Sequence, residues 1–317
     1  MTASMGERVG TVELLARAVA HLLGTSSPVA TFHMVPADAE NSATSVRRYE
    51  VEVGGAERIR VVVKACSLRE RIVLALLDGA EAVPRAFVED TSSDRTVDVV
   101  MMDAGDSASG LDGRAKRLAA EALSEVHVRF LGRDAELSRL PGLTEEYLRD
   151  VIVSGCWRRA WVTSLADQRF QHEFGSWVPS VEASAADLPV DLLSFSHRLQ
   201  LNTLAHTDIR PERLRDVGER ALVLGWREAR CAPLFLDVGN IFDTQTSGWI
   251  YRDALAARGV LFDDDVFSRG HLLARRFAGI RYLRFRLASW LAAPGELSRD
   301  RLQRTLAMAA GTTSDAA

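Results

Sequence analysis

A chain of 317 residues is long enough for one large domain or two smaller ones, each with its own hydrophobic core. Hydrophobic residues make up 47% and charged residues 26%, which is the composition of a globular protein and excludes a disordered chain. The net charge of −4 gives no whole-molecule attraction to nucleic acid or to an anionic membrane, so we expect neither as a partner, although local basic patches stay open.

The cysteines and the N-terminal residues indicate a reducing, cytoplasmic location. Cys66, Cys156 and Cys231 are far apart, odd in number and without Cys-x-x-Cys spacing, which argues against a disulfide framework and against a zinc site. No signal-peptide pattern opens the chain, and no apolar run approaches the roughly 20 residues that span a bilayer. Abundant Ala, Arg, Leu and Val with few lysines is typical of GC-rich bacterial genomes.

The first hundred residues predict a small part that is rich in strands. Helical spacing of apolar residues, alternating strand patterns and turn signals give, in order, a helix over 9–24, strands over 49–53 and 59–64, a helix over 67–82 and a strand over 96–102. Gly24 is a helix stop, Gly54-Gly55 joins the first two strands into a hairpin, and Pro84 marks the end of the second helix.

After residue 102 the pattern becomes mainly helical. The Gly-, Ser- and Asp-rich segment that starts at Asp103 is the predicted boundary between an N-terminal lobe, 1–103, and a C-terminal lobe, 104–317. The predicted elements of the second lobe are a short strand over 221–224 and helices over 112–132, 144–175, 187–201, 262–293 and 298–310. This order indicates an α+β protein.

Three blocks of the second lobe carry recognisable chemistry. They read His206-Thr-Asp208-Ile-Arg-Pro-Glu-Arg213, then Ala221-Leu-Val-Leu-Gly225-Trp226-Arg-Glu228, then Pro233-Leu-Phe-Leu-Asp237-Val-Gly-Asn240. Their order and spacing resemble the aminoglycoside phosphotransferase and choline kinase family, whose blocks read His-Gly-Asp-x-x-x-x-Asn, Ile-Asp-Trp-Glu and Gly-Pro-x-x-x-Asp-Leu-Ala. The resemblance covers roughly residues 30 to 290. It implies a two-lobed, protein-kinase-like fold with a small antiparallel sheet lobe and a larger helical lobe.

The resemblance also implies roles for residues of the first and third blocks. Phosphoryl transfer needs a carboxylate that orients the attacking hydroxyl and takes its proton. Asp208 matches that base, His206 matches the residue that supports its loop, and Asp237 matches an aspartate that hydrogen-bonds the loop backbone. A lone His-x-Asp is common by chance, but its setting before Asp237 and after a strand lysine favours a homologous loop.

The nucleotide implied by the resemblance is ATP. Lys64 matches the phosphate-binding lysine and Glu70 its ion-pair partner, although Lys64 has the alternative of being a charge on an edge strand. Segment 38–46 falls at the phosphate loop and has no glycine, and Ser42 within it is expected to contact the nucleotide. Met102 falls where the adenine-binding hinge would lie.

Two positions depart from the family pattern, and both concern magnesium. Arg213 stands where the family has a metal-binding Asn, and Gly225 stands where it has a metal-binding Asp, so we expect no magnesium at the usual ligands. Arg213 either replaces the metal as a fixed cation bound to phosphate or is a solvated side chain. Glu228 is either a substitute ligand or an exposed acidic residue.

Two further features have competing interpretations. His127 ends a helical stretch and is interpreted as a core residue. The arginine- and aromatic-rich segment 274–290 is either a core helix with a solvated basic face or a docking face for an acidic substrate or partner protein.

Two functions are compatible with these residues. The first is a pseudokinase-like or repurposed protein that takes part in bacterial tailoring of small molecules or peptides in secondary metabolism, with a small-molecule, peptide or protein partner. The alternative is an active ATP-dependent phosphotransferase with an atypical metal site, which modifies a hydroxyl of a small molecule or a peptide Ser or Thr.

Overall fold

The computed structural model describes residues 5–24, 29–35, 46–53, 57–105 and 111–312. The chain forms two compact units, and each contains two stretches of sequence. Unit 1 comprises Met1–Ser107 and Arg213–Glu228, and unit 2 comprises Ala108–Glu212 and Ala229–Ala317. The predicted lobes are continuous stretches, whereas here residues 213–228 return to the N-terminal unit.

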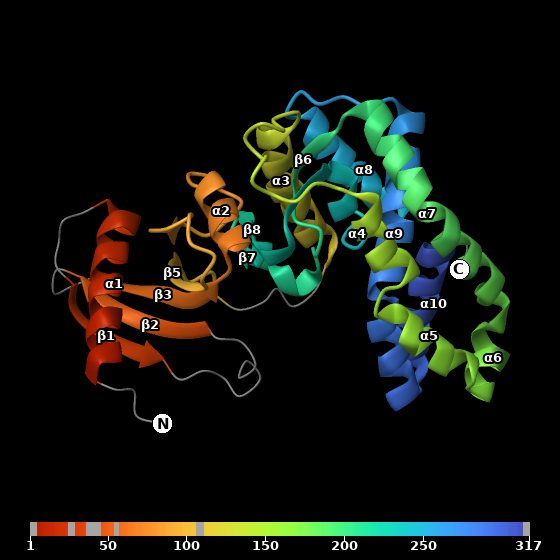
Figure 1. Cartoon of the computed structure of the whole chain (residues 1–317), viewed down its shortest axis with the longest axis horizontal. Coiled ribbons are helices and arrows are strands. Elements are labelled where there is room, and N and C mark those ends of the chain that lie inside the picture. The colour runs from red at the N-terminus through yellow and green to blue at the C-terminus, as the bar shows by residue number, and fades with distance from the viewer. Residues whose placement is uncertain (1–4, 25–28, 36–45, 54–56, 106–110, 313–317) are drawn as a thin grey trace. The chain divides into compact units, whose positions relative to one another are not determined.

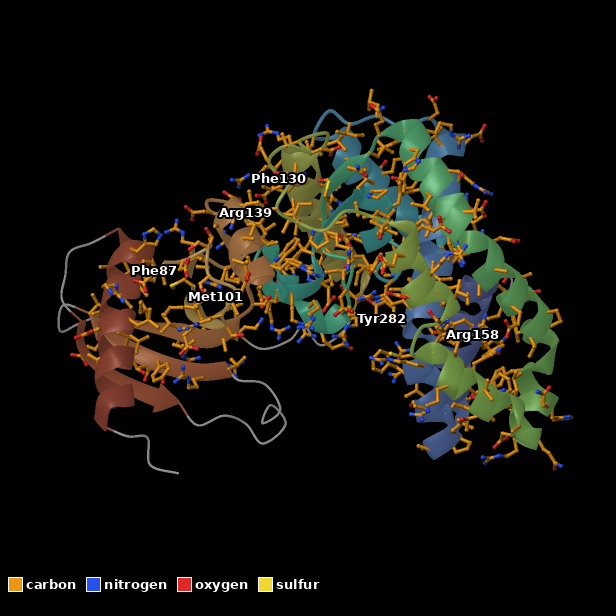
Figure 2. The ribbon with its side chains drawn as sticks, in the orientation of Figure 1. Phe87, Met101, Phe130, Arg139, Arg158 and Tyr282 are labelled. Carbon is orange, nitrogen blue, oxygen red and sulfur yellow. The ribbon has the colours of Figure 1, made fainter. Side chains whose placement is uncertain are left out.

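Unit 1 is built on a five-stranded antiparallel sheet with strand order β1-β2-β3-β5-β4 (Figure 1). The strands are β1 (Val29–Val35), β2 (Val46–Val53), β3 (Glu57–Cys66), β4 (Ala86–Phe87) and β5 (Val97–Met102). The predicted hairpin is confirmed, because Val51 of β2 lies opposite Ile59 of β3. The sequence also predicted β5, but neither β1 nor the two-residue β4. In β4, Phe87 pairs with Val100 and Ala86 pairs with Met101; Phe87 and Met101 are labelled in Figure 2.

Helix α1 (Met5–Leu23) packs across this sheet (Figure 1). Its buried residues repeat at helical spacing, and those on the strands alternate, so each element presents one apolar face. The two faces form a shared core of Leu15, Ala18, Val19 and Leu22 from the helix with Val51, Val61, Val63 and Val100 from the strands. This core fixes the sheet that carries Lys64.

Helix α2 (Leu68–Leu76) follows β3 directly. The side chain of Ser67 caps it by accepting a hydrogen bond from the backbone N–H of Glu70 at 3.3 Å, which places Glu70 in the first turn. The predicted helix was too long: the residues after Leu76 form turns that include Gly79 at φ 75°. Also in unit 1, β7 (Leu214–Val217) and β8 (Arg220–Val223) form a small hairpin, of which only β8 was predicted.

Unit 2 is mainly helical. Its helices are α3 (Gly113–Phe130), α4 (Glu145–Leu148), α5 (Trp157–Leu165), α6 (Gln168–Phe174), α7 (Val178–Leu199), α8 (Gln245–Ala256), α9 (Asp264–Ala292) and α10 (Glu296–Ala310). A two-stranded ribbon pairs β6 (Asn202–Ala205) with β9 (Arg230–Pro233). The long α9 packs against α5, α7 and α10 and forms the centre of the unit.

The predicted helix over 144–175 is wrong as a single element. A π-helical turn, Arg149–Val153, follows α4, and Asp167 begins α6 by accepting hydrogen bonds from the N–H groups of Arg169 and Phe170. Trp157 and Trp161 are buried in the core, with ring centroids 5.9 Å apart. Arg158, labelled in Figure 2, follows Trp157 on α5. Its guanidinium covers Trp157 at 4.3 Å and pairs with Glu182 of α7 at 2.5 Å.

Two other helices of unit 2 differ from prediction. Helix α7 begins at Val178, well before the expected residue 187, and continues through Pro189. Helix α8 was not predicted, although Thr244 and Ser247 form a capping box at its start. None of the helices in the described ranges combines the length and the hydrophobicity that a bilayer crossing requires.

Candidate functional site

The loop that carries His206 and Asp208 follows β6 in unit 2, and a buried carboxylate holds its backbone. Asp237 accepts hydrogen bonds from the backbone N–H groups of His206 and Thr207, both at 2.6 Å. Asp237 is fully buried, so these bonds also satisfy a charge that would otherwise be costly to bury. The hydrogen bonding expected of Asp237 is confirmed.

His127 of α3 completes the support of Asp237. Its Nε2 lies 3.1 Å from Asp237 Oδ2 and its Nδ1 lies 2.6 Å from the hydroxyl of Tyr251. Burial first, and then the charge of Asp237, raises the pKa of Tyr251 well above its ordinary value, so the phenol stays protonated and donates to Nδ1. His127 is fully buried, which confirms its interpretation as a core residue.

Thr207 adopts a backbone conformation that β-branched residues rarely take. Its φ is 60°, and its side chain is buried. The family pattern has glycine between the histidine and the aspartate, and glycine adopts this conformation without strain. The hydrogen bond from its N–H to Asp237 holds the peptide in place.

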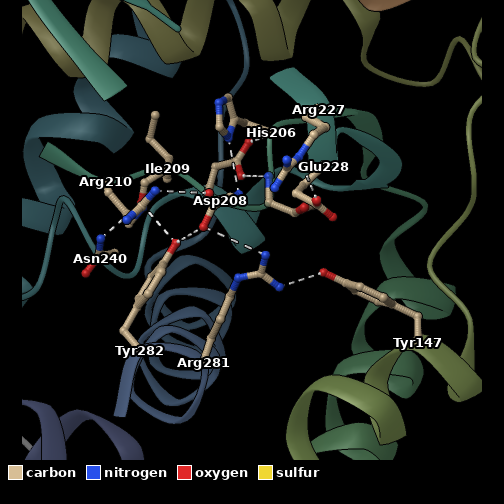
Figure 3. A network of polar contacts seen from close by, with 12 residues as sticks. Tyr147, His206, Asp208, Ile209, Arg210, Arg227, Glu228, Asn240, Arg281 and Tyr282 are labelled. Carbon is tan, nitrogen blue, oxygen red and sulfur yellow. Dashed lines mark hydrogen bonds and ion pairs between the residues drawn. The ribbon is translucent and has the colours of Figure 1, made fainter. Parts of the chain in front are cut away.

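Asp208 itself is surrounded by cationic and hydroxyl donors of unit 2 (Figure 3). The hydroxyl of Tyr282 on α9 donates to Asp208 Oδ1 at 3.3 Å, and Arg281 Nη2 lies 3.8 Å from the same oxygen. Arg210 Nη2 lies 3.5 Å from Oδ2. The Asp208 N–H donates to Nδ1 of the buried His206 at 3.2 Å. The expected base is therefore a carboxylate with two guanidinium groups within 4 Å of its oxygens.

The α9 contacts to Asp208 could not be derived from the blocks that predicted the loop. Tyr282 and Arg281 lie in the segment interpreted as amphipathic, about seventy residues after Asp208. Burial raises the pKa of Tyr282 above its ordinary value, which keeps the phenol as a hydrogen-bond donor. In the sequence, the indication of this contact was a tyrosine next to an arginine on the apolar face of an arginine-rich helix.

The predicted lysine–glutamate pair lies within unit 1. Lys64 Nζ contacts Glu70 Oε1 at 2.5 Å, and Glu70 is buried. Lys64 faces Val46 of β2 on one side and Val99 of β5 on the other, so the alternative of an edge-strand charge is wrong. Burial and the neighbouring Glu70 raise the pKa of Cys66 to about 12, which leaves its thiol protonated. Contact between Lys64 and a nucleotide stays a prediction.

The two departures from the metal-binding pattern touch each other. Gly225 has φ 80°, and a Cβ atom added to it would lie 2.6 Å from Arg213 Nη1 and 2.9 Å from Arg213 Cζ. The N–H of Leu224 donates to the Arg213 carbonyl at 2.8 Å, which fixes the two segments side by side. The guanidinium group thus fills the space in which an aspartate side chain at position 225 would begin.

The residues present do not fit a magnesium ion at these positions. Magnesium is held by carboxylate, carbonyl and water oxygens, whereas a guanidinium offers only N–H donors. Within the described residues, no group of three or more His, Cys, Asp or Glu side chains is placed to hold a metal. Asn240, the amide of the third block, directs its Nδ2 to the carbonyl of Ile209 at 2.9 Å.

Glu228, the candidate substitute ligand, is paired with arginines. Its carboxylate lies 3.4 Å from Arg227 and 4.0 Å from Arg69 of α2, and its side chain is 37% exposed. This environment fits the interpretation of an exposed acidic residue.

Met102 lies beside a cavity of about 510 Å³ within unit 1. Its N–H donates to the carbonyl of Arg85 at 3.0 Å, and the cavity is lined in addition by Leu22, Val83, Pro84, Asp103 and Leu222. Such a volume is within the range of small-molecule sites. Adenine binding at Met102 stays a prediction, and Ser42 lies outside the described residues.

Comparison of the sequence with profiles of known protein families and with curated proteins gives no match. Solved structures resemble the fold. A Ralstonia eutropha protein assigned as an aminoglycoside phosphotransferase has a TM-score of 0.54 and 15% identity, covering 96% of this chain and 96% of its own. The aminoglycoside phosphotransferase APH(4)-Ia, in a complex with ADP and hygromycin B, has a TM-score of 0.51 and 14% identity, covering 93% and 98%.

The ethanolamine kinase of Plasmodium vivax has a TM-score of 0.50 and 10% identity, covering 88% of this chain and 82% of its own. At such identities the likeness concerns the fold. The chain therefore has the two-lobed, protein-kinase-like α+β fold of aminoglycoside phosphotransferases and ethanolamine kinases, as its resemblance to the aminoglycoside phosphotransferase and choline kinase family predicted.

Proposed function

We propose that this protein is a pseudokinase-like, repurposed member of its fold, which binds a nucleotide such as ATP without magnesium and takes part in bacterial tailoring of a small molecule or peptide in secondary metabolism. The observation that carries the proposal is the Arg213 guanidinium packed against Gly225, at the two positions that would hold metal. The cytoplasmic location stays a prediction from the sequence.

Unit 1 offers two fixed positive charges for phosphate, those of Lys64 and Arg213. Lys64 is held by Glu70 of α2, and α2 packs against the short 3-10 helix Trp226–Glu228 that begins directly after Gly225. A guanidinium can donate two parallel hydrogen bonds to a phosphate and carries its charge at every physiological pH. It does not bridge the β- and γ-phosphates as metal ions do in kinases. We therefore infer nucleotide binding with impaired transfer.

The surroundings of Asp208 support the same inference. A general base needs a carboxylate oxygen directed at the reacting hydroxyl. Here one oxygen faces Tyr282 and Arg281, and the other faces Arg210. These donors compete with a hydroxyl for the oxygens of Asp208.

A second candidate is an active phosphotransferase with an atypical metal site. It is favoured by the retained Lys64–Glu70 pair and by the loop that Asp237 holds in place. In this alternative Asp208 takes the proton of a small-molecule hydroxyl or a peptide Ser or Thr, and the phosphoryl group passes from ATP to that oxygen.

Calorimetric titration of ATP into the full chain, with magnesium and with a chelator, separates the two candidates. We expect affinities that agree within about twofold in the two buffers, and an Arg213→Ala variant that binds about tenfold or more weakly, since one charge-assisted hydrogen-bonding group is lost. The matched control is Arg58→Ala, which removes an exposed arginine from β3 of the same unit.

Binding that requires magnesium, with turnover that disappears in Asp208→Ala, would contradict the proposal and establish the second candidate. Absence of any ATP binding would remove the nucleotide from the proposed function. For the biological role, a gene position beside a short precursor peptide supports peptide tailoring, and a position in a housekeeping operon counts against it.

A further inference from the structure

Arg281 links the candidate loop to an aromatic side chain on another helix of unit 2. Its Nη2 lies 3.8 Å from Asp208 Oδ1, and its Nη1 donates to the hydroxyl of Tyr147 at 3.1 Å (Figure 3). The Asp208 contact is longer than the 2.7–3.2 Å of a strong N–H···O bond, as is the 3.5 Å contact from Arg210. Both guanidinium groups are thus close to Asp208 without being locked to it in a bidentate pair.

Positive charge also gathers at the far end of the loop. Arg286 of α9 lies within electrostatic range of Glu212 and of Arg301 and Arg304 on α10. Burial first, and then the charge of Arg301, lowers the pKa of Arg286, whereas Glu212 acts in the opposite direction. The carboxylate of Glu212 therefore lies near several arginines, whose positive charges repel one another.

We call the arginines at these two ends together the arginine cluster. Its members are Arg210, Arg281, Arg286, Arg301 and Arg304, and they lie near the carboxylates of Asp208 and Glu212. The whole chain has a net charge of −4, so this gathering of arginines is a local arrangement and does not follow from composition. Like charges held together lose repulsion when an anion binds among them.

The aromatic side chain of Tyr147 lies beside the cluster. The guanidinium of Arg230 lies 3.7 Å from the ring centroid of Tyr147, whose hydroxyl accepts from Arg281. Tyr147 therefore contacts one cation with its ring and another with its oxygen. Planar guanidinium groups held against aromatic rings are the usual recognition groups for carboxylate and phosphate.

We propose that the arginine cluster binds an anionic ligand, so that the acceptor or partner of this protein presents a carboxylate or phosphate group to Arg281 beside Asp208. The inference rests on the proposed function in one respect, since it takes Asp208 to lie where the acceptor binds. An aminoglycoside, which is a polycation at neutral pH, is repelled here and is excluded as the ligand.

Binding of matched probes tests this inference. The probes are a short serine peptide flanked by glutamates, the same peptide flanked by lysines, succinate and inorganic phosphate, each titrated calorimetrically into the full chain at low and high salt without nucleotide. We expect the glutamate peptide to bind at least about tenfold more tightly than the lysine peptide, and its affinity to fall as salt rises.

Variants of α9 localise the binding. Arg281→Gln is expected to weaken binding of the best anionic probe about tenfold, because a charge-assisted hydrogen-bonding group is removed. Arg281→Lys keeps the charge and is expected to weaken binding less. Arg284→Gln is the matched control: it removes an exposed arginine that covers Phe285 on the same helix, and we expect unchanged affinity. Thermal unfolding of each variant verifies that it is folded.

The outcomes distinguish the sources of the anion. Binding of the glutamate peptide alone assigns a peptide, and binding of succinate or phosphate alone assigns a small anionic molecule; both support the cluster as an anion site. The inference is overturned if no anionic probe binds, if the lysine peptide binds as well as the glutamate peptide, or if Arg281→Gln and Arg284→Gln bind alike. Because no nucleotide is present, a failed ATP titration leaves this result unaffected.

Discussion

Thr207 concentrates backbone strain at the centre of the candidate loop. A β-branched residue at φ 60° is held in the left-handed region, where side chains crowd the backbone, at a cost of about 1–3 kcal/mol. The two hydrogen bonds from the loop to Asp237 hold it there. Such strain persists only where the surroundings determine the conformation, and here they are the supports of Asp208.

Glycine at position 207 should relieve this strain. We expect Thr207→Gly to be more stable than Thr207→Ala by about 1 kcal/mol in the free energy of unfolding, since the two variants differ only in the Cβ atom that the left-handed backbone disfavours. Urea unfolding of both variants measures the difference. If the alanine variant is the more stable one, the backbone at Thr207 is not strained.

Single residues could be predicted from the sequence where their spacing along the chain identifies them. Lys64 and Glu70 are six residues apart across a strand end and a helix start, and the third block places Asp237 at a fixed distance from the loop. Arg281 and Tyr282 reach Asp208 only because α9 returns to the loop, which is a tertiary contact without a local pattern. The contact between Arg213 and Gly225 could not be predicted from the sequence for the same reason.

At the scale of elements, α9 and α10 cross closely at a glycine. A Cβ atom on Gly279 of α9 would lie 2.3 Å from the backbone nitrogen and 2.8 Å from the Cα of Ala309 on α10. The atoms in the way belong to helical backbone, which cannot rotate aside as a side chain can. The absence of a side chain at position 279 therefore sets how closely the two helices approach.

Gly279→Ala is expected to destabilise the protein by about 3 kcal/mol, because the added methyl group overpacks the α9–α10 crossing. The control is Gly113→Ala at the start of α3, where an added Cβ has only a flexible arginine atom at 3.8 Å and alanine is the better helix former. Chemical denaturation compares the two. Equal stability of the variants would mean that the helices can separate at no cost.

Elements were predicted well where their ends carry local signals. Asp112 caps α3, and Gly311 ends α10 at φ 75°, so both helices match their predicted ranges closely. The helix predicted over 144–175 was wrong because the apolar period continues across the cap at Asp167. Short strands such as β6 and β9 are defined by distant partners, which their few residues do not reveal.

At the scale of the whole molecule, a buried histidine ties stability to pH. His271 is buried on α9, and its Nε2–H donates to the carbonyl of Phe242 at 2.6 Å. Burial lowers the pKa of His271 to about 4, with Arg275 acting in the same direction and Asp243 and the Phe242 bond opposing it. The folded protein therefore holds this imidazole neutral at pH values where an unfolded chain protonates it.

The stabilisation that depends on neutral His271 is present above about pH 6.5 and is lost as pH falls toward 4, because the unfolded state then binds the extra proton. The expected loss over this window is about 3 kcal/mol. Urea unfolding between pH 8 and pH 4.5 measures it, and His271→Gln should give a flatter profile. A wild-type profile without any decline would show that His271 titrates normally in the fold.

The contact between Arg213 and Gly225 also affects the order in which substitutions at these two positions can occur during evolution. With arginine at position 213, a side chain at position 225 would have to displace the guanidinium and adopt a φ of 80°, so a carboxylate returns to 225 more readily after position 213 has changed. In the forward direction the order is reversed, since the guanidinium takes its present place where position 225 has no side chain. A lineage that has taken both steps therefore meets a cost when position 225 alone reverts.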